Sequence, residues 1–291
     1  MRPLLALVAV TAVWGVTFVQ VKDALALYPL FAFLAVRFAI STAVLAPFAW
    51  GSLRRLPRHG VAAACAVGVL LALAYGLQTA GLELTTVAST GFITGLYVVF
   101  TPLLALALWK TRVPAAAWGG VGLSLVGLLL LSGVPGGSLI GNVLVLGNAV
   151  AQSGQIAAME RLAPRHDPRA LTFLQMAVCF VGFSVIAGAS GQVEVPHGRT
   201  VWAALVVTGV FAGALGYLVA TWVQARTTAA RAALVFTLEA PFAALFGVLL
   251  ADEVLGWAGW LGCGVMLAGI VLAEPAAAAV LRRLVPRGRA A

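Results

Sequence analysis

Charge is the scarcest property of this sequence. Only 9% of its 291 residues are charged and 62% are hydrophobic, whereas soluble domains carry about 25% charged residues. Water therefore cannot be the main solvent of the folded chain. Most of the apolar excess lies in runs of about 20 residues, which is the length that an α-helix needs to cross a bilayer. These runs predict an integral membrane protein.

Residues that build metal sites and catalytic centres are also scarce. Cys65, Cys179 and Cys263 lie in apolar runs without a CxxC spacing, and the three histidines lie outside the core of these runs. The runs offer no nucleophile with a base and no pair of acids. A GxxxxGK[ST] phosphate-binding loop is missing as well. We therefore expect no metal, no cofactor and no enzyme activity.

The basic residues orient the chain rather than bind nucleic acid. The net charge is +9, but the basic residues lie in short segments between apolar runs and form no long basic tract. With the N-terminus in the cytoplasm, 15 of the 18 basic residues fall on the cytoplasmic side, as positively charged loops prefer. These are Arg2, Arg54, Arg55, Arg58, Lys110, Arg112, Arg161, Arg165, Arg169, Arg226, Arg231, Arg282, Arg283, Arg287 and Arg289. Lys22 and Arg199 fall on the other side, and Arg37 lies inside a run. Both termini are therefore predicted to be cytoplasmic. The Arg-, Ala- and Gly-rich composition favours a bacterial inner membrane.

Proline, glycine and charged residues divide the chain into ten apolar runs. We predict transmembrane helices near 3-21, 29-50, 60-82, 88-109, 114-132, 139-159, 169-189, 200-224, 230-251 and 257-274. The connections are too short for a soluble domain. The first run is long enough to span and lacks a clear cleavage site, which favours a retained helix over a signal peptide. Small residues such as Gly120 and Gly262 predict close helix contacts in the fifth and tenth spans, within the fold or at a dimer interface.

The two halves of the sequence repeat each other. At an offset of 142 residues Tyr75 aligns with Tyr217, and Tyr97 aligns with Glu239. Because each half has an odd number of crossings, the second copy must enter the membrane from the opposite side. We therefore predict an all-α membrane protein of ten transmembrane helices in two inverted five-helix repeats, 1-137 and 138-291. Inverted repeats are common in secondary transporters.

Short strings in both halves carry a family resemblance. They are VWGVTFVQVK (13-22), VRFAIS (36-41), LTTVASTGFITGLYVVFTPLLALAL (84-108), WGGVGLSLVGLLLL (118-131), ERLAPRHDPRALTFLQM (160-176), QARTTAARAALVFTLEAPFAALFGVLLADE (224-253) and WLGCGVMLAGIVL (260-272). In this order and spacing the chain resembles the EamA family of the drug/metabolite transporter superfamily. The resemblance implies a ten-helix, export-type carrier for metabolites or amphipathic compounds, with a central cavity between its halves.

Polar and aromatic residues inside the spans are the candidates for solute binding, because polar groups are expensive in hydrocarbon unless they are paired or face water. We expect a binding site made of Trp14, Tyr75, Gln78, Thr94, Tyr97, Gln152, Tyr217 and Glu239. Several of them have structural alternatives. The hydroxyls and Gln78 could bond to the preceding helical turn or to a neighbouring helix, and Trp14 could pack in the core.

Two charged residues lie well inside the predicted spans. Burial disfavours the charged form of Glu239, so this residue could carry a coupling proton, pair with Arg37 or a cationic solute, or serve as a protonated structural carboxyl. Arg37 could support the fold, bind a substrate carboxylate or form a salt bridge to Glu239. Pro102 and Pro241 are expected to kink the fourth and ninth spans and to act as hinges.

The sequence as a whole predicts a secondary transporter. We expect it to export small metabolites, such as amino acids or amphipathic compounds, by alternating access, as a monomer or homodimer in the lipid bilayer. Proton coupling through Glu239 is one alternative, and facilitated diffusion or exchange is the other. A non-transporting membrane scaffold or sensor is the competing interpretation.

Overall fold

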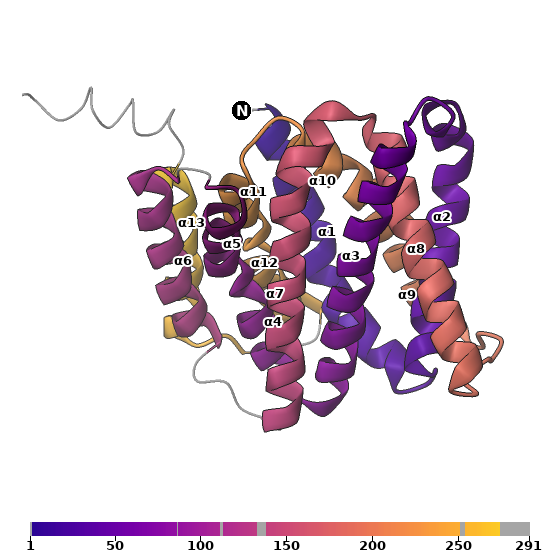
Figure 1. Ribbon diagram of the computed structural model, residues 1–291. Helices are drawn as coiled ribbons and strands as arrows, with labels where there is room; N and C mark the ends of the chain where they lie inside the picture. The colour runs from indigo at the N-terminus through magenta and orange to yellow at the C-terminus, as the bar shows by residue number, and fades with distance from the viewer. Residues whose placement is uncertain (1, 86, 111–112, 133–137, 251–253, 274–291) are drawn as a thin grey trace, which may run out of the picture.

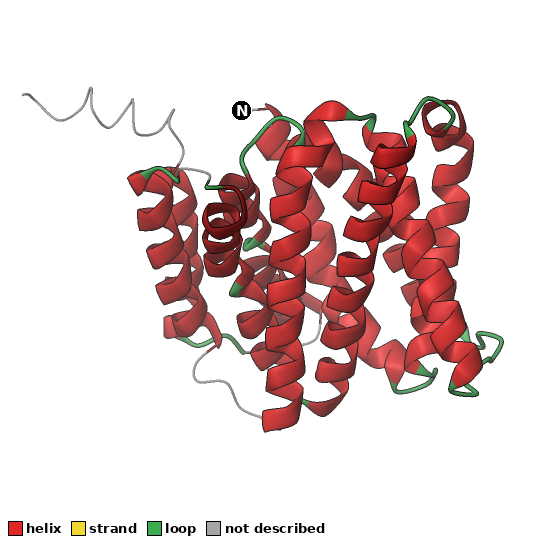
Figure 2. Cartoon of the chain, viewed as in Figure 1, coloured by secondary structure: helices red, strands yellow, loops and turns green. Residues whose placement is uncertain are grey.

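The computed structural model describes residues 2–85, 87–110, 113–132, 138–250 and 254–273. Over these residues the regular secondary structure is entirely helical (Figure 2). In chain order the elements are α1 (Arg2–Leu25), α2 (Leu30–Leu53), α3 (Arg58–Leu84), α4 (Val87–Gly95), α5 (Tyr97–Trp109), α6 (Ala115–Ser132), α7 (Leu139–Leu162), η1 (Ala163–Arg165), α8 (Pro168–Ala189), α9 (Arg199–Val206), η2 (Val207–Gly216), α10 (Tyr217–Gln224), α11 (Ala229–Phe236), α12 (Glu239–Leu250) and α13 (Trp257–Ala273).

Length and composition identify the chain as a multi-pass membrane protein. In the described parts of the chain, seven helical segments are long and apolar enough to cross a membrane. The shorter apolar helices α6 and α13 match the fifth and tenth predicted spans. Helix α7 has 24 residues and matches the sixth predicted span. Asn148, Gln152 and Gln155 make it more polar than its neighbours. The count of ten crossings remains a prediction.

The basic connections lie together at one end of the bundle. In Figure 1 the connections after α2, α7 and α10 lie at the same end as the N-terminus, whereas those after α1, α3 and α8 lie at the other end. The first end therefore carries Arg54, Arg55, Arg165 and Arg226. That this end faces the cytoplasm remains a prediction. Five further basic residues used in the charge count lie outside the described residues: Arg112, Arg282, Arg283, Arg287 and Arg289.

The fourth and ninth predicted spans are each broken in the middle. The fourth is divided into α4 and α5 around Leu96, and the ninth into α11 and α12 around Leu238. At both breaks a backbone N–H bonds to the carbonyl three residues earlier, instead of the carbonyl four residues earlier as in an α-helix. The Leu96 N–H donates to the Ile93 carbonyl and the Leu238 N–H donates to the Val235 carbonyl, each at 3.1 Å.

Each break lies on the N-terminal side of a proline that the sequence suggested as a kink. Pro102 follows the first break and Pro241 follows the second. A proline has no N–H for the carbonyl one turn earlier, and its ring crowds that carbonyl, so the helix is weakened on this side. The helices are thus interrupted near both prolines. Motion at these points as hinges remains a prediction.

The eighth predicted span is also irregular. Its middle, η2, is a π-helix that separates α9 from α10. Glycines let neighbouring helices approach it closely. A Cβ atom at Gly209 would lie 3.0 Å from the Arg37 carbonyl oxygen of α2. The Ser41 hydroxyl of α2 donates to the Gly209 carbonyl at 2.7 Å. The π-helix is therefore held against α2 by direct backbone contact.

Helices α6 and α13 pack side by side at one edge of the bundle (Figure 1). Their backbones approach through glycines: a Cβ atom would lie 2.7 Å from the Gly262 carbonyl oxygen if added to Gly127, and 2.8 Å from the Gly269 carbonyl oxygen if added to Gly120. Small residues permit such close packing of membrane helices. The predicted close contacts of these two spans therefore lie within the fold.

Replacing Gly127 should separate this pair of helices. We expect Gly127→Ala to lower the free energy of unfolding by about 1–3 kcal/mol, because the new methyl group overpacks the contact. Gly122→Ala on the same helix is the matched control, since a Cβ atom there meets nothing within 4 Å. Unfolding in mixed micelles, followed by circular dichroism, measures both variants. Equal effects of the two substitutions would contradict the packing of α6 on α13.

Candidate functional site

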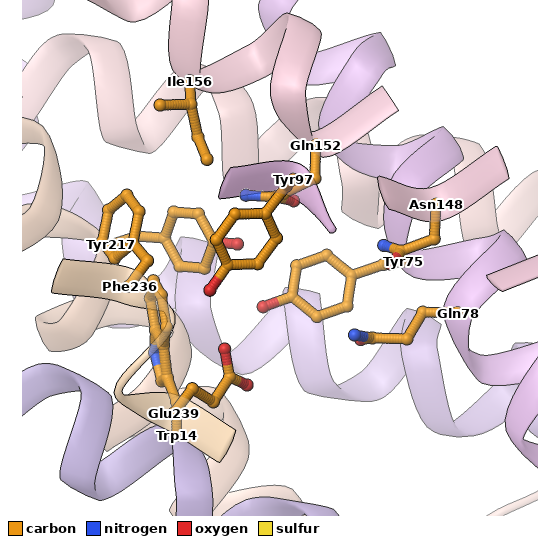
Figure 3. Close-up of a pocket in the computed structure, with 10 residues that line it drawn as sticks. All are labelled: Trp14, Tyr75, Gln78, Tyr97, Asn148, Gln152, Ile156, Tyr217, Phe236 and Glu239. Carbon is orange, nitrogen blue, oxygen red and sulfur yellow. The ribbon is translucent and has the colours of Figure 1, made fainter. Parts of the chain in front are cut away.

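A cavity lies inside the bundle where helices from both ends of the sequence meet. It is lined by Trp14, Tyr75, Gln78, Tyr97, Asn148, Gln152, Ile156, Tyr217, Phe236 and Glu239 (Figure 3). These side chains come from α1, α3, α5, α7, α10, α11 and α12. The cavity leaves about 30 Å³ for the centres of water molecules, which is room for only a few waters. A solute the size of an amino acid would require the helices to move apart.

Seven of the eight residues expected at a binding site line this cavity. The eighth, Thr94, lies directly behind the wall. Its hydroxyl accepts a hydrogen bond from the Gln78 amide at 3.2 Å and donates to the Asn148 side-chain oxygen at 3.1 Å. The fold thus brings together residues that are far apart in the sequence. Solute binding by them remains a prediction.

Sequence reasoning missed three lining residues: Asn148, Ile156 and Phe236. The first two lie four residues before and four residues after Gln152, so the three positions share one face of α7. This spacing was a usable signal. The Asn148 amide also donates to the Ala74 carbonyl at 3.0 Å, which ties α7 to α3. Phe236 carries no such signal, because an apolar residue inside an apolar run does not show which way it faces.

Aromatic rings form one wall of the cavity. The Trp14 ring stacks on Phe236 with centroids 5.4 Å apart and meets Tyr217 at 5.1 Å. The Trp14 indole N–H donates to the Ala212 carbonyl of η2 at 3.1 Å. Gly216 permits this approach, since a Cβ atom there would lie 2.9 Å from the indole nitrogen. Trp14 therefore both packs in the core and lines the cavity.

Glu239 supplies a carboxyl group to the cavity. It is the first residue of α12, directly after the break in the ninth predicted span. Figure 3 shows its carboxyl group and the hydroxyls of Tyr75 and Tyr97 pointing into the same central space. Tyr97 is likewise the first residue of α5. The two breaks therefore place a carboxyl and a phenol at the same cavity.

Arg37 reaches the cavity only through Tyr75. Its guanidinium donates to the Tyr75 hydroxyl at 3.3 Å and lies 4.7 Å from the centre of that ring. Among the described residues, the ion pair found is between Arg169 and Asp167, so the salt bridge considered between Arg37 and Glu239 is not formed. The reason is geometric, because the Arg37 side chain packs on the Tyr75 ring behind the cavity wall. Arg37 is only 5% exposed, so it is buried in this position.

Comparisons with known proteins agree with this architecture. The model of the EamA-like transporter family matches residues 1–133 and, separately, residues 139–274. A protein of Archaeoglobus fulgidus named "Uncharacterized transporter" is 31% identical over 271 residues, which are 92% of this chain and 84% of that protein. A solved crystal structure with 20% sequence identity has the same fold, with a TM-score of 0.76, over 97% of this chain and 98% of that one.

The bond from Trp14 to η2 can be tested without losing the aromatic ring. We expect Trp14→Phe to lower the free energy of unfolding by about 1–3 kcal/mol, because the buried Ala212 carbonyl loses its donor. Trp202→Phe is the matched control. Its indole also donates to a carbonyl, that of Pro196 at 3.1 Å, but it is 46% exposed, so we expect less than about 0.5 kcal/mol. Micellar unfolding curves measure both, and a neutral Trp14→Phe would contradict the role of this bond.

Proposed function

The chain belongs to the EamA-like transporter family of the drug/metabolite transporter superfamily, and from this premise we propose that it exports small organic solutes by alternating access. The central cavity carries the proposal. It lies inside the bundle, between the predicted halves, and gathers polar groups from several helices. Ligand sites between membrane helices typically have this form. The proposed location is a bacterial inner membrane, with both termini in the cytoplasm.

Two inverted repeats, 1–137 and 138–291, are part of this proposal. The family model matches the two halves separately, which supports the division. The breaks supply independent support, because Leu96 and Leu238 are separated by the same 142 residues that align Tyr75 with Tyr217. Two halves that can exchange conformations provide an inward-open and an outward-open state around one site. The breaks before Tyr97 and Glu239 are the proposed points of bending.

The wall of the cavity indicates the class of solute. Trp14, Tyr217 and Phe236 offer aromatic faces, which favour apolar, aromatic and cationic groups. Gln78, Asn148 and Gln152 offer hydrogen bonds. We therefore propose solutes with an apolar body and a polar or cationic group, such as amino acids and amphipathic amines.

Proton coupling through Glu239 is the proposed source of energy. Glu239 is the acid among the residues that line the cavity, so a proton and a cationic solute would compete for the same carboxylate. Such competition couples the exit of the solute to the entry of a proton. Without it, the same cavity would support only facilitated diffusion or exchange.

Flux measurements test the proposed transport. Proteoliposomes that contain the purified protein are loaded with a mixture of amino acids and hydrophobic amines, and the medium is assayed by mass spectrometry. We expect selective release of one solute class, which an imposed pH gradient accelerates. Binding of a solute without any release would instead favour the scaffold or sensor.

Glu239→Gln separates coupled from uncoupled transport. The amide keeps the size of the side chain but cannot exchange a proton, so we expect flux that no longer responds to the pH gradient. Glu194→Gln is the matched control, because Glu194 lies in the connection between α8 and α9. Its backbone carbonyl, which accepts the Tyr28 hydroxyl, is retained in that variant. An unchanged pH response in Glu239→Gln would remove Glu239 as the coupling residue.

A further inference from the structure

A second cavity, of about 380 Å³, opens at the end of the bundle that carries the basic connections. It lies where the last turn of α2 meets η1 and the start of α8, and it shares no lining residue with the central cavity. Its charged lining residues are Arg55, Arg165, Asp167 and Arg169, so three are arginines and one is an acid. His166 adds an imidazole, and Phe48 and Leu56 are apolar.

The single acid is already satisfied by its neighbours. One carboxylate oxygen of Asp167 accepts the backbone N–H of Arg169 at 2.9 Å, and the other accepts the Arg169 Nη2 at 2.8 Å. The Ser52 hydroxyl donates to the second oxygen at 2.9 Å. These bonds, led by that of the Arg169 side chain, lower the pKa of Asp167 to about 2. Asp167 is therefore ionised at neutral pH and neutralises Arg169.

Arg55 and Arg165 are left without a counter-charge. Neither makes an ion pair or a hydrogen bond from its side chain within the described ranges. Both side chains are exposed, and both line the cavity. Two guanidinium groups that line one cavity, neither with an acidic partner, favour the binding of an anion there. Guanidinium groups suit phosphate in particular, because their planar N–H groups can bond two of its oxygens.

The ends of two candidate spans place the cavity at the edge of the membrane. Leu30–Leu53 ends beside it and Pro168–Ala189 begins beside it. Phe48, which lines the cavity, is 62% exposed, and the nearby Trp50 is 58% exposed. The guanidinium carbon of Arg54 lies 5.0 Å from the centre of a Trp50 ring. Tryptophan at a helix end marks the interface of lipid and water. The cavity therefore has a basic wall and an apolar wall open to lipid.

We propose that this cavity binds the phosphate headgroup of an anionic phospholipid. Arg55 and Arg165 bond the phosphodiester oxygens, and the acyl chains descend past Phe48 into the bilayer. Inorganic phosphate carries the same kind of negative charge but has no apolar group that could contact the exposed apolar wall. The lipid would lie in the leaflet where the charge distribution predicts the cytoplasm, and basic pockets between helices on that side suit anionic headgroups. The proposal is independent of transport and of Glu239.

Lipid binding to the full-length protein tests the proposal. The purified chain in detergent is titrated with dioleoyl phosphatidylglycerol or dioleoyl phosphatidylcholine, and bound lipid is counted by native mass spectrometry. We expect the protein to bind one molecule of phosphatidylglycerol tightly and to bind phosphatidylcholine much more weakly. The double variant Arg55→Gln with Arg165→Gln should bind phosphatidylglycerol about 25-fold more weakly, from roughly fivefold for each arginine.

A second double variant separates the cavity from general surface charge. Arg58→Gln with Arg226→Gln removes the same charge from the same end of the bundle, but neither residue lines the cavity. This control should keep the affinity for phosphatidylglycerol within about twofold of wild type, because it leaves both cavity arginines in place. An equal loss of affinity in the two double variants would overturn the site.

Two further measurements identify the ligand and guard against misfolding. Inorganic phosphate at millimolar concentration should leave phosphatidylglycerol bound. Its displacement of the lipid, together with phosphate-dependent thermal stabilisation of wild type alone, would overturn the lipid assignment in favour of a soluble anion. Arg55→Gln and Arg165→Gln are also tested singly, each with the expected fivefold loss. A folded single variant with wild-type affinity would contradict the role of that arginine.

Discussion

The bilayer offers no water to the polar groups of a membrane-spanning chain, and the arrangement of this protein follows from that constraint. Side chains such as Asn148 (2% exposed) and Gln175 (0% exposed) lie inside the bundle, where other protein groups satisfy them. The outward positions are apolar, as Val185 with 65% exposure illustrates. Polar groups that must avoid lipid gather along the same interior surfaces. A polar cavity inside the bundle is the natural consequence.

The same constraint explains where the backbone is irregular. Interrupted helices are tolerated at membrane depth only where protein or a cavity covers the exposed carbonyl and N–H groups. The break at Leu96, the break at Leu238 and the π-helix η2 all adjoin the central cavity, through Tyr97, Glu239 and the bond from Trp14. π-helical turns are often found at functional sites. These irregular backbone segments and several polar side chains thus meet at one cavity.

Much of this organisation could be predicted from the sequence. Runs of apolar residues located the helices, because hydrocarbon thickness imposes their length. The cost of burying polar groups pointed to Tyr75, Tyr97 and Glu239, which do meet at one cavity. The sequence left the answer open where the direction of a side chain mattered. The sequence could not show that Arg37 lies against the Tyr75 ring rather than beside Glu239, since both positions are compatible with a mid-span residue. The inward-facing Phe236 was hidden among other apolar residues for the same reason.

The proposed export requires the central cavity to open alternately to each side of the membrane. The most direct test uses Gln152→Cys in a chain in which Cys65, Cys179 and Cys263 are replaced by alanine. A membrane-impermeant thiol reagent is applied to proteoliposomes from the outside in one experiment and from the inside in another, and labelling of the new cysteine is measured. Alternating access predicts labelling from either side, with transported solute slowing both reactions. Labelling from one side only, with or without solute, would contradict alternating access around this cavity.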